Sequence, residues 1–219
     1  GMNGIIQELT GLLKTKNIGT DSDRALLLDF QATLETKPEK AIKLEKDALA
    51  QIENITADNA RLVSNLHANL GGLYRMNGHP DLAREHMEKS ISLLDQFNLL
   101  HINDSIPQIA NYAMFLTEQQ EPERGISELQ KLSGIIKEYH SDDCLDYAKV
   151  QETLGTIYLM TANLSQAKTH FKRAFKIYEK TWADEPEMIE AKYQEIQELY
   201  PQVGFFLGQQ ISSFLTKQA

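Results

Sequence analysis

The fold of this chain is indicated by two short stretches, ETLGTIY at residues 152–158 and SQAKTHFKRA at residues 165–174. Residues of the same kind precede them at steps of 42 residues. In the first stretch the corresponding triplets are Leu70-Gly71 with Tyr74, Tyr112-Ala113 with Leu116, and Leu154-Gly155 with Tyr158. A fixed period of this size, with helical spacing inside each unit, predicts a stack of paired helices.

The second stretch keeps the same register. We call the set of residues at one position of the 42-residue repeat a column. One column of the second stretch has small side chains, Ala83, Gly125 and Ala167, and the column four residues later has large apolar ones, Met87, Leu129 and Phe171. Two antiparallel helices approach closely where a small side chain faces a large one. We therefore expect this stripe of residues to form the packed core, and we place no functional site on it.

This set of columns resembles the tetratricopeptide repeat, and the spacing is similar to the long-helix variety of kinesin light chains and bacterial peptide-sensing regulators. The resemblance implies an all-α fold, a right-handed α-α superhelix of about eleven antiparallel helices. The middle unit departs most from the family pattern, with Tyr112 and Ala113 where the family prefers Leu and Gly. Packing there is expected to be fitted by different residue sizes.

One further step of 42 residues toward the N-terminus reaches Ala41 and Ala48, which fit the two columns of small residues. Asp29 and Glu45 do not fit their columns, because they stand 42 residues before Gly71 and Met87. We interpret residues 21–54 as a degenerate repeat and expect one domain over residues 1–219. The expected parts are an N-terminal capping helix in 2–20, the degenerate repeat 21–54, repeats at 58–97, 105–139 and 145–183, and C-terminal helices in 186–219.

Capping residues mark several helix boundaries. Thr36-Lys-Pro-Glu39 has the form of a capping box, and Pro80, Pro122 and Pro186 mark starts of helices. The stripe of the N-terminal capping helix consists of Ile5, Ile6, Leu9, Leu12 and Leu13. Ser105 and Ser165 mark two more helix starts.

Charge and composition exclude several classes of protein. The formal net charge of −9 over 219 residues, with scattered basic residues, argues against nucleic-acid binding. No run of apolar residues is long enough to span a membrane, and no secretory signal is visible. The single cysteine, Cys144, suits a reducing compartment, so we expect a cytoplasmic protein.

No catalytic or cofactor motif is recognisable, and an enzyme is not expected. We expect no cofactor and no metal site. The only tight group of metal-ligating residue types is His140, Asp142, Asp143 and Cys144. A single thiol with one imidazole is a poor zinc site, and the Ser-Asp-Asp run is better interpreted as a helix cap. His79 and His86 are interpreted as exposed polar surface.

The resemblance implies that the first helix of each pair lines a concave groove for a peptide or a partner helix. The column before the Leu-Gly pair reads Asn69, Asn111 and Thr153. Because a carboxamide both donates and accepts, such a ladder could hold the main chain of a bound peptide. The same face is expected to present Asn65, Arg75, Met114, Lys149 and Thr156. The competing interpretation is that these are ordinary polar residues facing water.

Two apolar regions carry separate hypotheses. Repeat register places Ala25, Leu28 and Ala32 inside, which leaves Leu27, Phe30 and Leu34 as an apolar contact patch. The competing explanation, favoured by the irregularity of this repeat, is that the helix is rotated or that the N-terminal helix folds over it. Near the C-terminus, adjacent Phe205 and Phe206 point in different directions on a helix, so we hypothesise a homodimer through a chain end.

Two function classes follow. The first is a non-catalytic scaffold that binds a peptide or partner helix in its concave groove. The second is the peptide-sensing regulatory domain of a bacterial signalling system, in which a peptide shifts the repeat stack between two states. A DNA-binding segment would distinguish them, and none is visible.

Overall fold

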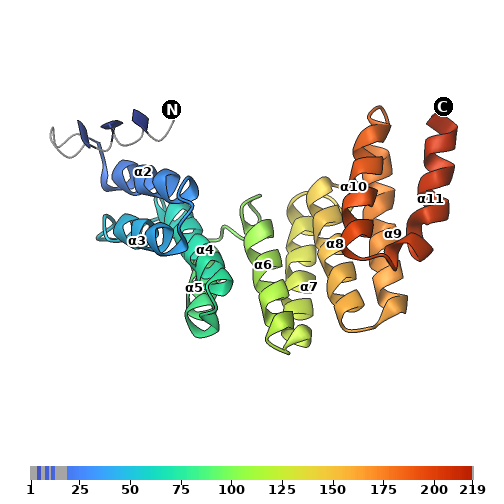
Figure 1. The fold of residues 1–219 in the computed structure, drawn as a ribbon, viewed down its shortest axis with the longest axis horizontal. Coiled ribbons are helices and arrows are strands. Elements are labelled where there is room, and N and C mark those ends of the chain that lie inside the picture. Colours follow the sequence, from blue (N-terminus) through green and yellow to red (C-terminus); the bar gives the residue numbers. More distant parts are fainter. Residues whose placement is uncertain (1–3, 6–7, 10, 13–18, 219) are drawn as a thin grey trace. The chain divides into compact units, whose positions relative to one another are not determined.

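The computed structural model describes residues 4–5, 8–9, 11–12 and 19–218, and these residues contain helices, turns and no β-strand. The helices are α2 (Asp21–Thr33), α3 (Pro38–Leu49), α4 (Ala60–Met76), α5 (Pro80–Gln96), α6 (Ser105–Glu118), α7 (Pro122–Tyr139), α8 (Leu145–Met160), α9 (Leu164–Thr181), α10 (Pro186–Leu199) and α11 (Val203–Gln218). The all-α repeat fold is therefore confirmed (Figure 1).

The predicted N-terminal capping helix lies mostly outside the described residues. Within it, residues 4–5, 8–9 and 11–12 are helical, and Ile5, Leu9 and Leu12 are exposed. Ile6 and Leu13 of the expected stripe lie outside the described residues. The capping role stays a prediction.

The chain divides into two compact units, Gly1–Tyr112 and Ala113–Ala219, called unit 1 and unit 2 below. The division falls within α6. In unit 1, α2 packs on α3, α4 packs on α5, and α3 joins the two pairs by packing on α4. In unit 2, α8 packs on α9 and on α7, and α11 packs on α9 and α10.

Four helices begin with proline, at Pro38, Pro80, Pro122 and Pro186. Proline suits the first helical position because the N–H that it lacks would have no partner within the helix, and its φ is already helical. These starts confirm the sequence prediction for α5, α7 and α10. The predicted start at Ser105 is also confirmed, and that at Ser165 is one residue late, since α9 begins at Leu164.

The capping box predicted at Thr36 is wrong. The residue that caps α3 is Lys37, whose side chain makes no capping hydrogen bond. Instead, Oε1 of Glu35 accepts hydrogen bonds from the backbone N–H groups of Thr36 (2.9 Å) and Lys37 (3.0 Å). A capping box is present at the start of α2, where Thr20 and Asp23 bond each other's backbone N–H groups.

The core follows the small-against-large rule, most closely at the glycines. A Cβ on Gly71 would lie 2.6 Å from Cγ of Met87, and one on Gly155 would lie 2.9 Å from Cδ2 of Phe171. In the middle repeat, a Cβ on Gly125 would lie 2.6 Å from the backbone oxygen of Ala113. The middle hairpin is thus fitted differently, with glycine in the second helix against the backbone of the first.

A common turn ends the first helix of three repeats. Residues 78, 120 and 162 have left-handed φ values of 75° (Gly78), 67° (Gln120) and 58° (Ala162). The next backbone N–H donates in each case to a carbonyl five residues earlier, at 2.9 Å for His79 to Tyr74, 2.8 Å for Glu121 to Leu116 and 2.8 Å for Asn163 to Tyr158. This is the Schellman arrangement, which favours glycine at the left-handed position. Only the first of the three repeats has that glycine.

Candidate functional site

Unit 1 contains a polar pocket of about 330 Å³ between α4 and the first half of α6. We call it the amide pocket, and its lining residues are Asp29, Asn65, Ala68, Asn69, Asp104, Pro107, Gln108 and Asn111. A second pocket of about 220 Å³ shares Ala68, Gln108 and Asn111 with it. The structure thus brings together Asn65, Asn69 and Asn111 of the predicted groove residues, with Arg75 lining the second pocket.

Gln108 anchors one wall of the amide pocket. Its Oε1 accepts hydrogen bonds from the hydroxyls of Ser64 (2.9 Å) and Ser90 (2.5 Å). Its Nε2 donates to Oδ1 of Asn65 at 2.5 Å. Because Ser64, Ser90 and Gln108 are buried and bonded to one another, they hold the Asn65 amide in a fixed orientation.

Asp104 is the acidic group on the same side of the pocket. Arg61 donates to both of its carboxylate oxygens, with Nε at 2.6 Å and Nη2 at 3.0 Å. These hydrogen bonds hold the pKa of Asp104 below its ordinary value, so the group is ionised and its charge is balanced by the guanidinium. Asn65 also donates to Asp104, at 3.3 Å.

Asn69 bridges two carboxyl groups on the other side of the pocket. Its Nδ2 donates to Oδ1 of Asp29 at 2.8 Å and to Oε1 of Glu45 at 3.2 Å. Asp29 and Glu45 come from α2 and α3, and the shared Asn69 amide holds their carboxyl groups near each other. Asn69 is therefore occupied in part by the protein itself, while its carbonyl oxygen accepts no hydrogen bond from a described residue.

Glu45 is only 2 % exposed, and its Oε2 has no hydrogen-bond donor in the described part of the chain. Burial, and then the neighbouring charge of Asp29, raise the pKa of Glu45 to about 9. Burial also raises the pKa of Asp29. Because no described cation pairs with these two adjacent carboxyls, ionisation of both at neutral pH is unfavourable, and we expect the pair to hold one proton.

Asn111 is exposed and lines both pockets. Its side-chain amide makes no hydrogen bond with any described residue. The amide can therefore offer a donor and an acceptor to a ligand without breaking an internal bond. Arg75, partly buried, and Met76, 82 % exposed, lie along the second pocket, so its lining includes a charged side chain and a flexible apolar one.

The other predicted groove residues belong to unit 2. Met114 is half-buried, and Lys149 is exposed with its Nζ 3.3 Å from Oδ1 of Asp146. The hydroxyls of Thr153 and Thr156 donate to backbone oxygens one helical turn earlier, at 3.0 and 3.1 Å. Their roles in binding stay predictions.

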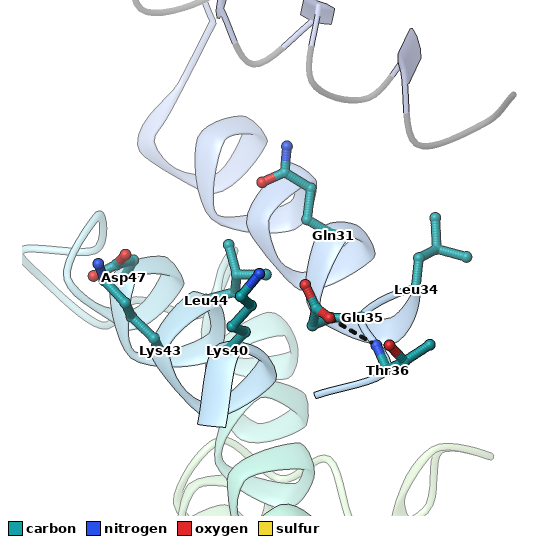
Figure 2. A pocket seen from close by; sticks show the side chains of 8 residues that line it. All are labelled: Gln31, Leu34, Glu35, Thr36, Lys40, Lys43, Leu44 and Asp47. Atoms are coloured by element: carbon teal, nitrogen blue, oxygen red, sulfur yellow. Dashed lines mark hydrogen bonds between the residues drawn. The ribbon is translucent and has the colours of Figure 1, made fainter. Parts of the chain in front are cut away.

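The three residues of the predicted apolar patch differ in their exposure. Ala25, Leu28 and Ala32 are buried as expected, Phe30 is 49 % exposed, and Leu27 is half-buried. Leu34 is 40 % exposed and also lines a pocket of about 540 Å³ with Leu44 of α3, so the contact patch stays a prediction. Figure 2 shows that the other side chains around this pocket are polar or charged, from α2, the following turn and α3.

The two adjacent phenylalanines of the C-terminal helix, on which the homodimer hypothesis rests, differ in exposure. α11 buries Val203, Leu207 and Ile211, whereas Phe205 is 89 % exposed and Phe206 is half-buried. One face of α11 therefore covers its neighbours, and Phe205 faces solvent. The homodimer stays a prediction.

The interpretation of His86 as exposed surface is wrong. Nδ1 of His86 lies 2.9 Å from Nδ1 of His67, and its ring stacks on Tyr74. Burial lowers the pKa of both histidines, and that of His67 to about 4. The equivalent positions of the third repeat form a similar pair, with Nδ1 of His170 2.9 Å from Oε1 of Gln151 and its ring on Tyr158.

The repeat register of the sequence indicates this contact between helices, although the interpretation of His86 as surface overlooked it. Residues 86 and 170 are two repeat steps apart, and both are histidine; residues 74 and 158 are likewise both tyrosine. A shared polar and aromatic column of this kind indicates a contact inside each hairpin. His67 and His86 therefore belong to the packing of α4 on α5.

The described residues contain no group of three or more His, Cys, Asp or Glu side chains arranged to hold a metal ion. Cys144 is the N-cap of α8, and its sulfur accepts from the backbone N–H of Tyr147 at 3.4 Å. Asp142 and Asp143 form ion pairs with Arg173 and Lys180. Across the described ranges, every helix is too short or too polar to cross a membrane.

The comparison with known proteins identifies the repeat. Residues 105–180 match the family model described as Tetratricopeptide repeat. No curated protein matches the chain.

Solved structures extend the likeness over nearly the whole chain. BtubC (BKLC) from P. vanneervenii has a TM-score of 0.72 at 19 % identity, over 97 % of this chain and 84 % of that one. The TPR-like repeats of a putative kinesin light chain from P. anserina have a TM-score of 0.63 at 16 % identity, over 82 % and 90 %. MamA has a TM-score of 0.55 at 15 % identity, over 80 % and 88 %.

At these identities the likeness concerns the fold. It agrees with the family match, with the 42-residue period and with the small-against-large packing of the hairpins. Residues 105–180 therefore carry the tetratricopeptide repeat, and the chain shares the all-α repeat fold of the solved structures.

Proposed function

We propose that this protein is a scaffold that binds an extended peptide segment of a partner protein in unit 1, along the amide pocket and the second pocket beside it. Tetratricopeptide repeats generally act as non-catalytic modules that bind proteins. The observation that carries the proposal is the clustering of Asn65, Asn69, Gln108 and Asn111 around one pocket.

The chemistry of the pocket fits a main chain. A peptide in extended conformation presents N–H and C=O groups that need partners when they leave water. Asn111 has both of its functions available, and Asn69 has its carbonyl oxygen available. The network around Gln108 holds Asn65 in place, so part of the ordering cost of binding is already met in the unbound protein.

The test is selection of peptides on the immobilised chain from a random library, followed by affinity measurement for the selected sequences. Asn111→Ala is expected to weaken binding about tenfold, because each lost hydrogen bond at a desolvated site contributes about 1–2 kcal/mol. Gln96→Ala is the control, since it removes an exposed amide from α5 that lines neither pocket. Equal affinity of the wild type and Asn111→Ala would contradict the proposal.

A peptide-sensing regulatory domain would use the same pockets. The two functions differ in whether the bound peptide changes the arrangement of the helices. Small-angle scattering of the chain with and without a selected peptide distinguishes them: an unchanged profile supports the scaffold, and a changed profile supports the sensor.

A further inference from the structure

The amide pocket has an acidic side whose charge is not balanced by any described residue. Asp29 lines the pocket, Asn69 lies beside it, and Glu45 is buried against both. In the described part of the chain, neither carboxyl forms an ion pair with a lysine, arginine or histidine. The other acidic group of the pocket, Asp104, is paired with Arg61.

A second observation points toward a missing partner. Glu45 is 2 % exposed, and its Oε2 has no hydrogen-bond donor among the described residues. Its Oε1 lies 3.2 Å from Nδ2 of Asn69, so the carboxyl group lies directly behind a side chain that lines the pocket. A buried carboxyl oxygen without a donor is costly unless a proton or a cation satisfies it.

The repeat register shows that packing does not require these groups. In the following repeats the two positions hold Gly71 with Met87 and Gly155 with Phe171. The first hairpin has carboxyls at both positions, next to the pocket. Replacing buried ionisable pairs by apolar residues is often neutral or stabilising, so packing alone gives no reason for this pair.

Resting on the proposed peptide groove, we propose that Asp29 and Glu45 form a binding site for a cationic side chain of the bound peptide, lysine or arginine. The cation enters through the amide pocket and takes the place of the proton that the two carboxyls share. Glu45 then releases its proton to solvent, and both carboxylates face the ammonium or guanidinium group. Asn69 stays bonded to both carboxyls and keeps them in position.

The surrounding charges allow this exchange. Arg61 is engaged by Asp104, and Lys46, next to Glu45 in the chain, has its Nζ 5.7 Å from the centre of the Tyr74 ring. Arg75 lines the second pocket but not the amide pocket. Because Glu45 must lose a proton when the cation binds, affinity for a cationic peptide is expected to rise with pH.

The experiment compares two blocked peptides, acetyl-Ala-Ala-Lys-Ala-Ala-amide and its norleucine counterpart, by titration calorimetry with the full chain at pH 7.5. Norleucine keeps the length of the lysine stem and removes the charge. We expect the lysine peptide to bind about tenfold more tightly, as a charged hydrogen bond in a desolvated site would give. Measurements in two buffers of different ionisation enthalpy are expected to report release of up to one proton per bound peptide.

Two variants locate the effect. Asp29→Asn is expected to reduce the affinity for the lysine peptide to that for the norleucine peptide. Glu45→Gln keeps the Asp29 carboxylate and is expected to bind the lysine peptide without proton release. Circular dichroism of both variants checks that the fold is kept.

The outcomes separate the two proposals. Equal affinities of the two peptides, with both weakened by Asn111→Ala, would overturn the cation site and leave the groove in place. An unchanged preference for lysine in Asp29→Asn would also overturn it, and the acid pair would then be structural only. Binding of neither peptide up to about 5 mM, an affinity weaker than about −3 kcal/mol, would contradict the groove as well.

Discussion

In hairpin α8–α9, Gly155 of the first helix faces the ring of Phe171, whereas the same two columns of hairpin α2–α3 hold the carboxyls of Asp29 and Glu45. The first arrangement excludes water and needs no polar partner. The second brings two acids together under a bridging asparagine, and it also lacks the left-handed turn found at residues 78, 120 and 162. The difference indicates that the α8–α9 columns serve packing, while those of α2–α3 hold the acid pair of the proposed cation site.

Removal of the large residue of the apolar pair is expected to have the largest effect. Phe171→Ala is expected to cost about 3–5 kcal/mol, because Phe171 is fully buried against Gly155 and leaves a cavity. Because repeat proteins unfold in part locally, hydrogen exchange is the suitable measurement, and protection should be lost first in α8 and α9. A cost below about 1 kcal/mol would show that this contact does not hold the hairpin together.

Hairpin α2–α3 is tested by replacing its two acidic residues with the residue types found at the same repeat positions of hairpin α4–α5. The double change Asp29→Gly and Glu45→Met copies Gly71 and Met87, and it is expected to stabilise unit 1 by about 2 kcal/mol at pH 8. The pKa of Glu45 is raised to about 9, so the folded state holds a proton that the unfolded state releases. Wild-type stability should therefore fall as pH rises from about 4.5 toward 9, and the double variant should lose that slope.

Glu45→Gln serves as the control, because it removes the titrating group and keeps the shape of the side chain. Thermal unfolding at a series of pH values from 5 to 9 compares the three proteins. Parallel pH profiles for all three would mean that the carboxyl pair does not hold a proton in the folded state.

The histidine pairs allow two of the regular hairpins to be compared, α4–α5 and α8–α9. His67→Gln turns the His67–His86 pair into the Gln–His pair seen at Gln151 and His170. The pKa of His67 is lowered to about 4 mainly by burial, so the fold favours neutral histidine and wild-type stability should fall as pH drops from about 6.5 toward 4. The variant should keep about 1 kcal/mol more stability at pH 4.5. Identical acid unfolding midpoints would refute this role.

The smallest effect concerns the repeated turn. Ala162→Gly and Gln120→Gly are each expected to stabilise the protein by up to about 1 kcal/mol, because they place glycine at a left-handed position. Gly78→Ala is the reverse change and should destabilise by a similar amount. The thermal midpoints of the three variants give the check, and a lower midpoint for the two glycine variants would contradict it.

The sequence was sufficient for the regular part of the fold, because its columns obey one packing rule at a fixed step. Gly71, Met87, Gly155 and Phe171 could be assigned to the core from spacing alone. Prolines at helix starts were equally readable, since proline at the first helical position has a single backbone reason.

The candidate site was predictable only in part. Asn65, Asn69 and Asn111 were found from their register, and the structure places them around one pocket. The sequence does not show the partners of Asn69, although Asp29 and Glu45 depart from the residue types of their repeat columns. A residue that breaks a packing column signals altered chemistry, but only coordinates show that two such residues meet. The interaction of Gln108 with Ser64 and Ser90 also joins separate helices and leaves no periodic trace.

The most direct test is a carbon-detected NMR titration of the side-chain carboxyl carbons of Asp29 and Glu45 in the unliganded protein. The account predicts that the pair keeps one proton through neutral pH and loses it only well above pH 7, near the pKa of about 9 of Glu45. Asp29→Asn should lower that transition, since the neighbouring charge is gone. Ionisation of both carboxyls below pH 6 would contradict the account.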